Sequence, residues 1–109
     1  MTWFRYQYRS IKHTLFAIPN GGKRDVITAS IMKGEGVLPG VADIFFMVPN
    51  EKYHGLWIEM KTKTGKQSDS QKEFQLTCEK VGYGYIVCRS LEEFQQSIRE
   101  HLSTSPVLY

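Results

Sequence analysis

The sequence lacks any segment suited to a membrane. No apolar run approaches the roughly 20 residues that a transmembrane helix needs, and the N-terminal MTWFRYQYRS has no apolar core of the secretory type. Internal repeats, low-complexity tracts and long linkers are also missing. We therefore expect one cytosolic domain over residues 1–109, in which 41% hydrophobic and 13% aromatic residues suffice for a single core.

Cysteine is scarce, and the histidines are scattered. Cys78 and Cys88 form no CxxC pair, so we expect neither a zinc site nor a disulfide framework, and burial as small hydrophobic side chains. His13, His54 and His101 lie too far apart in the chain for metal-ligand spacing, which favours surface or hydrogen-bonded histidines.

Acidic residues are absent from residues 1–24, although the net charge of the whole chain is only +3. That segment carries the basic residues Arg5, Arg9, Lys12, Lys23 and Arg24, and a second basic run comprises Lys61, Lys63, Lys66 and Lys72. Such clusters suit a polyanion such as nucleic acid. On charge alone, these clusters are explained equally well as solvated lysines on the surface of a soluble protein.

Apolar periodicity and turn residues predict an α/β order of elements. We expect helices over 3–13 and 24–34, a helix opened by Ser68 and another opened by Ser90, and strands over 15–18, 42–48, 56–61 and 83–89. Asn20, Gly21 and Gly22 predict a tight turn after the first strand. This order implies a single mixed β-sheet flanked by helices.

Two capping boxes mark the starts of the last two helices. Ser68 precedes Gln71 by three residues, and Ser90 precedes Glu93 in the same way. We expect Gly82 to end the first of these helices and the tail from Ser103 to be unstructured. The side chains predicted to face inward are Phe74, Cys78 and Val81 on the first helix, and Leu91, Phe94, Ile98 and Leu102 on the second.

An acidic and basic cluster is predicted where two strands meet. Asp43 starts one apolar strand, and Glu59 with Lys61 stands near the end of the next, so a hairpin brings all three together. Converging carboxylates repel unless a cation joins them, and oxygen ligands suit Mg²⁺ or Mn²⁺. Lys61 can then orient a water and stabilise charge on a phosphate. The alternative is an ordinary Glu59–Lys61 salt bridge on an exposed strand face.

These motifs resemble those of the PD-(D/E)xK nuclease superfamily, within it the VRR-NUC (virus-type replication-repair nuclease) branch. The segments that carry the resemblance are IPNGGKRD at 18–25, GEGVLPGVADIFF at 34–46, YHGLWIEMKTKTGKQSDSQ at 53–71 and GYGYIVCRS at 82–90. The resemblance implies a restriction-endonuclease-like core. It further implies that Asp43 and Glu59 bind metal with the Met60 carbonyl, that Lys61 is catalytic, and that Gln71 lies near the active site. Gln71 is also explained by its capping box alone.

The function expected from this resemblance is metal-dependent cleavage of DNA, with Mg²⁺ or Mn²⁺ as cofactor. We expect a homodimer acting on branched DNA such as a four-way junction, with part of the aromatic surface of the first helix meeting the partner. The residues expected to contact nucleic acid are Lys23, Arg24, Lys63 and Lys66. A protein that binds nucleic acid on a nuclease-like fold without cutting is the competing hypothesis.

One departure concerns the first helix, where members of the branch usually carry a metal-binding glutamate. This chain has no acid before Asp25, and only Gln7 matches the polar pattern, with Tyr6 or Trp3 in the same neighbourhood. Three explanations stay open: a late start of the chain, a metal held by fewer protein ligands, or a protein that binds without cutting.

Overall fold

A four-stranded mixed sheet forms the centre of the structure, a computed structural model that describes residues 1–19, 34 and 36–109. Its strand order is β1-β2-β3-β4, where the strands are β1 (Leu15–Ala17), β2 (Ile44–Phe46), β3 (Leu56–Met60) and β4 (Gly84–Cys88). The first three strands are antiparallel, whereas β4 runs parallel to β3. The mixed sheet predicted from the sequence is therefore confirmed.

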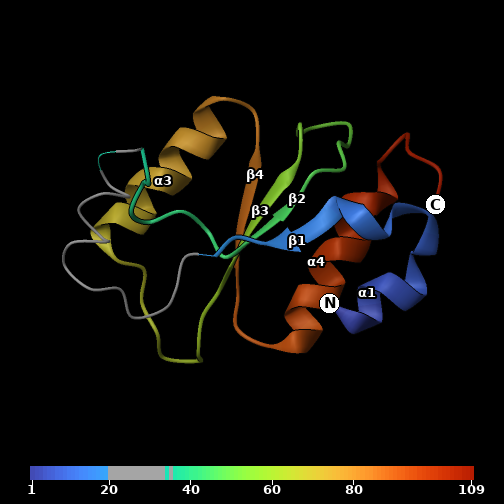
Figure 1. Cartoon of the computed structure of the whole chain (residues 1–109), viewed down its shortest axis with the longest axis horizontal. Helices are drawn as coiled ribbons and strands as arrows, with labels where there is room; N and C mark the ends of the chain where they lie inside the picture. The colour runs from blue at the N-terminus through green and yellow to red at the C-terminus, as the bar shows by residue number, and fades with distance from the viewer. Residues whose placement is uncertain (20–33, 35) are drawn as a thin grey trace.

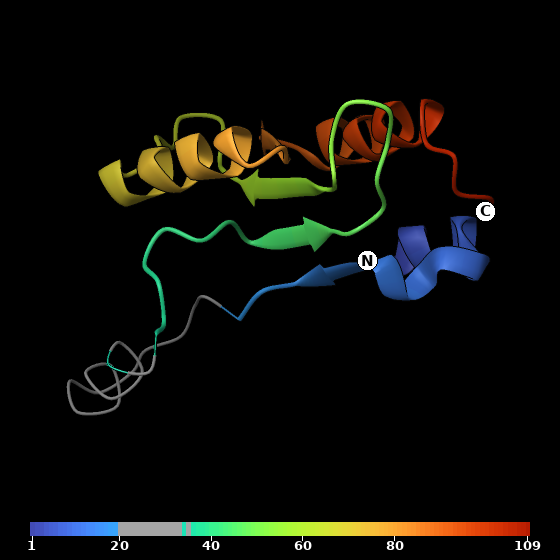
Figure 2. The same cartoon turned by 90° about the horizontal axis from the view of Figure 1, so that it is seen from above.

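Helices cover both faces of this sheet. Figure 1 shows α3 (Asp69–Lys80) on one side and α4 (Leu91–Ser103) with α1 (Thr2–Gln7) on the other, and Figure 2 gives the same arrangement from above. Strand alternation sorts the side chains between the two faces, because successive residues point in opposite directions. Ile58 joins the core toward α1 and α4, whereas Trp57 stacks edge-on against Phe74 of α3.

The hydrophobic core lies on the α1 and α4 side. Its fully buried members include Phe4 from α1, Phe46 from β2 and Ile98 from α4, and the Phe4 and Phe46 rings meet at a centroid distance of 5.5 Å. Cys78 and Cys88 are buried free thiols, as the sequence predicts. The predicted inward positions Phe94, Ile98 and Leu102 of α4 are confirmed.

The first helix is shorter than predicted. Instead of one helix over 3–13, α1 ends at Gln7, and a 3₁₀ helix, η1 (Arg9–Thr14), follows it. Tyr8 leaves helical geometry with φ −127° and ψ 63°, and Ile11 does so with φ −120° and ψ 23°. The kink lets Tyr8, Ile11 and Leu15 all reach the core while the chain turns into β1.

Two positions predicted to face inward are exposed, and the tail is docked. Val81 is 55% exposed because it is the C-cap residue of α3, beyond its last turn, and Leu91 is 63% exposed because it is the first residue of α4. Residues 105–109 form no regular structure, yet Ser105 Oγ donates to the Pro49 carbonyl at 2.7 Å and Val107 packs on the core.

Helix boundaries follow the predicted signals with one variation. Ser68 and Gln71 form a complete capping box at α3, and Gly82 takes a positive φ of 93° just after it. At α4, the Ser90 hydroxyl accepts the Glu93 N–H. The Glu93 carboxylate, however, accepts the Arg89 N–H in place of the Ser90 N–H that a complete capping box would use. Within the described residues, no helix is both long and apolar enough to cross a membrane.

Several predictions fall on residues outside the described ranges. They are the helix over 24–34, apart from Gly34, the turn at Asn20, Gly21 and Gly22, and the nucleic-acid contacts of Lys23 and Arg24.

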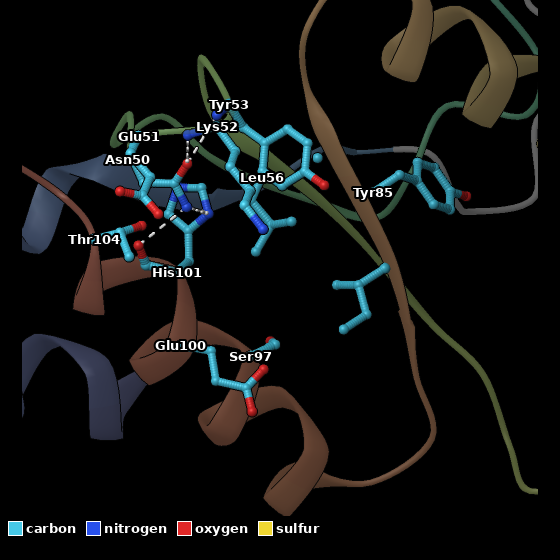
Figure 3. A pocket seen from close by; sticks show the side chains of 12 residues that line it. Asn50, Glu51, Lys52, Tyr53, Leu56, Tyr85, Ser97, Glu100, His101 and Thr104 are labelled. Carbon is cyan, nitrogen blue, oxygen red and sulfur yellow. Dashed lines mark hydrogen bonds between the residues drawn. The ribbon is translucent and has the colours of Figure 1, made fainter.

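His101 is the buried histidine of the domain, 5% exposed at the edge of a pocket between α4 and the β2–β3 hairpin (Figure 3). Its Nε2 lies 2.6 Å from the Val48 carbonyl oxygen, so Nε2 carries the proton and donates it. The unprotonated Nδ1 then accepts from Asn50 Nδ2 at 3.1 Å. This pairing uses the neutral ring, and burial lowers the pKa of His101 below its ordinary value of 6.5.

We predict that His101 makes the fold sensitive to acid. Because the pKa of His101 is lower in the folded than in the unfolded chain, the unfolded chain binds the proton first, and stability falls as the pH drops below 6.5. Urea unfolding at several pH values should show that His101→Gln removes up to about 1.4 kcal/mol of this loss per pH unit. The exposed His13 is the matched control, and His13→Gln should leave the loss unchanged. An equally steep loss in wild type and His101→Gln would contradict the prediction.

Candidate active site

The β2–β3 hairpin brings the two predicted acids together. Ile44 pairs with Ile58, so Asp43 and Glu59 stand opposite each other one residue further along. The Asp43 Oδ2 atom accepts the Met60 N–H at 2.7 Å, and the Asp43 carbonyl accepts the Ile18 N–H at 2.7 Å. Backbone N–H groups of Ile18, just after β1, and of Met60 in β3 thus fix Asp43 on both sides.

The Glu59 carboxylate is fully buried, with 0% exposure. Its Oε1 atom accepts a hydrogen bond from the Tyr85 hydroxyl, and Gln67 Nε2 lies 3.5 Å from the same oxygen. Its Oε2 atom has no hydrogen-bond partner among the described residues, and the Lys61 ammonium lies 3.6 Å away. A buried charged oxygen without a hydrogen bond is costly unless something else satisfies it.

Lys61 is held between Glu59 and the start of α3. Its Nζ donates to Gln71 Oε1 at 2.9 Å, and the same Gln71 oxygen accepts the Ser68 N–H at 2.8 Å. The two interpretations of Gln71, as a capping residue and as a residue near the active site, are therefore compatible. One amide oxygen closes the capping box and also orients the lysine beside the acids.

Tyr85 and Gln67 belong to this cluster as well, although no sequence pattern places them there. Figure 3 shows the Tyr85 side chain on the other side of β4 from His101, and its hydroxyl donates to Glu59. Burial first, and then this hydrogen bond, raise the pKa of Tyr85, so its hydroxyl stays protonated as a donor. The parallel register pairs Glu59 with Val87, which puts Tyr85 on the same face one step away. The register of β3 with β4 is therefore the information that would have placed Tyr85 beside Glu59.

The loop after Lys61 is tied down by Arg89. Arg89 Nη1 donates to the Thr62 and Gly65 carbonyls, both at 2.7 Å, and lies 3.5 Å from that of Lys63. Lys63 and Lys66 are exposed on this fixed loop. The segment that links Lys61 to α3 therefore presents two positive charges to solvent.

A cavity of about 280 Å³ adjoins Asp43 and Gln71. Residues 37–41 form one of its walls, and Ser68 and Ser70 at the start of α3 line another. Gly40 has a φ of 83°, and a Cβ there would lie 2.4 Å from the Ser70 carbonyl oxygen. Only glycine permits this close approach, which explains why a glycine stands three residues before the acid.

The donor set at the site suits a hard divalent cation. Glu59 Oε2, which has no hydrogen bond within the described part of the chain, belongs to the strand opposite Asp43, and oxygen ligands are those that Mg²⁺ and Mn²⁺ prefer. Within the described residues, no group of three or more His, Cys, Asp or Glu side chains is placed to hold a metal. The described part of the chain therefore offers the carboxylates of Asp43 and Glu59 here, without a third such side chain beside them.

The first helix supplies no acid to the site. Trp3 packs on the core on the α4 side of the sheet, where its ring meets that of Phe94 at 6.4 Å. Tyr6 is 70% exposed, and Gln7 is exposed as well. None of the described hydrogen bonds or ion pairs joins α1 to Asp43 or Glu59.

A mixed sheet whose β2–β3 hairpin sets Asp43 opposite Glu59, with Met60 and Lys61 following, is the arrangement expected of a nuclease domain of the PD-(D/E)xK type. A sequence profile of the VRR-NUC domain matches residues 6–92. The chain therefore belongs to the VRR-NUC domain family, a family of nucleases that bind nucleic acid.

A solved structure described as "VRR_NUC domain protein" has the same fold. The two superpose with a TM-score of 0.73, over 85% of this chain and 70% of that chain, at 23% sequence identity. A search of the curated proteins gave no match.

We predict that Ser68 and Gln71 stabilise the domain as one unit. Ser68→Ala and Gln71→Ala should each lower the free energy of unfolding by about 1 kcal/mol, because each removes a partner of the capping box. The double variant should lose less than the sum, since either change alone opens the box. Urea unfolding of the three variants measures these losses, and full additivity would show that the two side chains act separately.

Proposed function

We propose that this protein is an endonuclease that hydrolyses DNA phosphodiester bonds with Mg²⁺ or Mn²⁺. The observation that carries the proposal is the buried Glu59 Oε2 atom, which has no hydrogen bond to any described residue, on the strand opposite Asp43. An acid that served only structure would be expected to have both oxygens satisfied.

Each residue of the cluster has a place in this chemistry. Asp43 and Glu59 would hold the cation, with the Met60 carbonyl as the further ligand that the family resemblance implies. When bound, the cation would supply Lewis-acid chemistry for hydrolysis. Lys61, oriented by Gln71 at 2.9 Å, would stabilise the negative charge that develops on the phosphate.

The basic loop after Lys61 supports binding of a polyanion. Lys63 and Lys66 are exposed there, and contacts to phosphates position a nucleic acid without reading its sequence. Lys23 and Arg24 stay predictions for the same role.

A binding protein that does not cut is the second candidate, and the first helix favours it. With no acid on α1, the cation has fewer protein ligands than members of the family usually provide. Incubation of the purified protein with DNA and either Mg²⁺ or Mn²⁺ separates the candidates, because only the endonuclease yields shortened strands.

We predict that Asp43→Asn and Glu59→Gln abolish cleavage of DNA. Each variant removes a charged ligand, while the basic surface that binds DNA stays unchanged. Gel assays of cleavage, with DNA binding measured in the absence of divalent metal, test the two effects separately. Variants that still cut at the wild-type rate would rule out this site.

Lys61→Ala distinguishes a chemical role of the lysine from a structural one. The variant should lose cleavage yet bind Mn²⁺, because Lys61 contributes no metal ligand. Exposed Lys63 on the same loop is the matched control, and Lys63→Ala should weaken DNA binding with its Mn²⁺ affinity unchanged. Loss of Mn²⁺ binding in Lys61→Ala would show that the lysine holds the site together.

We propose further that the protein acts as a homodimer on branched DNA such as a four-way junction. A twofold pair would place two sites on one face, which suits a roughly symmetric substrate. The first helix leaves little aromatic surface for this pairing, because Trp3, Phe4 and Tyr8 pack on the core and only Tyr6 of these four rings is largely exposed.

Light scattering and paired substrates test this assembly. We expect a dimer at micromolar concentration, and faster cutting of a four-way junction than of a linear duplex of the same sequence. Tyr6→Ser should weaken the dimer if this ring lies in the contact. A monomer, or equal cutting of both substrates, would contradict the assembly and leave the nuclease proposal in place.

A further inference from the structure

The two oxygens of the Glu59 carboxylate have different surroundings. Oε1 accepts the hydrogen bond of the Tyr85 hydroxyl, whereas Oε2 has no hydrogen bond within the described part of the chain. Gln67 Nε2 stands 3.5 Å from both Glu59 Oε1 and the Tyr85 oxygen. Gln75 Oε1 on α3 accepts from Gln67 Nε2 at 3.0 Å and so anchors that amide.

These contacts fix the orientation of the carboxylate. The terminal torsion of a glutamate is broad and roughly twofold, so an unrestrained carboxylate has no single preferred direction for either oxygen. A donor on one oxygen selects one orientation and leaves the other oxygen available to a different partner. Tyr85 is well placed for this task, because its ring packs against that of Phe74 on α3, with 6.3 Å between the ring centroids.

We infer that Tyr85, assisted by Gln67, is a positioning residue that holds Glu59 with Oε2 directed to the divalent cation. This inference rests on the proposed metal site, which it deepens by assigning the groups that orient its buried ligand. Partners that hydrogen-bond a metal ligand typically change metal affinity or activity by about 10- to 100-fold when removed.

Mn²⁺ binding to Tyr85→Phe tests the inference. Phenylalanine keeps the ring and removes only the hydroxyl, so the dissociation constant for Mn²⁺ should rise by about tenfold or more. Electron paramagnetic resonance of the free ion measures this without any cleavage assay. Cleavage by Tyr85→Phe should recover as the Mn²⁺ concentration is raised, which a general loss of structure would not allow.

Tyr83, two residues before Tyr85 and on the same face of the sheet, provides the matched control. Its ring packs against Phe45 and His54, and its hydroxyl makes no hydrogen bond to any described residue. Tyr83→Phe should bind Mn²⁺ as the wild type does. If Tyr85→Phe also binds Mn²⁺ with wild-type affinity, the inference is overturned.

A Glu59→Gln variant separates this inference from the proposed function. Loss of Mn²⁺ binding in Glu59→Gln together with wild-type binding in Tyr85→Phe overturns the role of Tyr85 alone. Wild-type binding in Glu59→Gln overturns the metal site itself and the inference with it.

A second variant keeps the test decisive if Tyr85→Phe does not fold, as judged by circular dichroism. Gln67 stands on a polar loop and is the other donor near Glu59 Oε1. Gln67→Met removes this donor and keeps a side chain of similar length. Weaker Mn²⁺ binding by Gln67→Met, by about tenfold or more, supports the inference. Unchanged binding by this variant overturns it.

Discussion

The burial of the Glu59 carboxylate is the constraint on which the other features of the site depend. Taking a charged group out of water costs several kcal/mol unless hydrogen bonds and an opposite charge compensate. Here the compensation is uneven, because the Tyr85 hydroxyl satisfies Oε1, whereas among the described residues Oε2 has only the Lys61 ammonium, at 3.6 Å. This unevenness gives the proposed cation a definite place to bind.

Three parts of the fold meet at this carboxylate. The β2–β3 hairpin sets Asp43 opposite Glu59, the parallel pairing of β4 brings Tyr85 alongside, and the start of α3 supplies Gln71 to Lys61. Gln71 links stability with chemistry, because the oxygen that closes the capping box is also the one that orients the lysine. A change at the start of α3 would therefore be felt at the site as well as in the helix.

Much of the arrangement follows from short-range sequence signals. Asp43 and Glu59 meet because a hairpin register depends on nearby residues, and the start and end of α3 follow from Ser68, Gln71 and Gly82. Such signals act within a few residues or across one turn.

Long-range packing explains what the sequence did not predict. Tyr85 reaches Glu59 only through the parallel pairing of β3 with β4, which no local pattern reveals. The kink near Tyr8 and the docking of the tail likewise depend on the core that those segments cover. Val81 and Leu91 fit an apolar stripe by periodicity, yet each stands at a helix end where the covered surface stops.

A crystal structure of the protein grown with Mn²⁺ tests the central claim most directly, because anomalous scattering locates the ion independently of activity. The proposed site predicts one Mn²⁺ ligated by Glu59 Oε2 and Asp43, with Glu59 Oε1 still bonded to the Tyr85 hydroxyl. Density for the ion elsewhere, or Lys61 moved into direct contact with Glu59 Oε2 and no ion beside it, would contradict the claim.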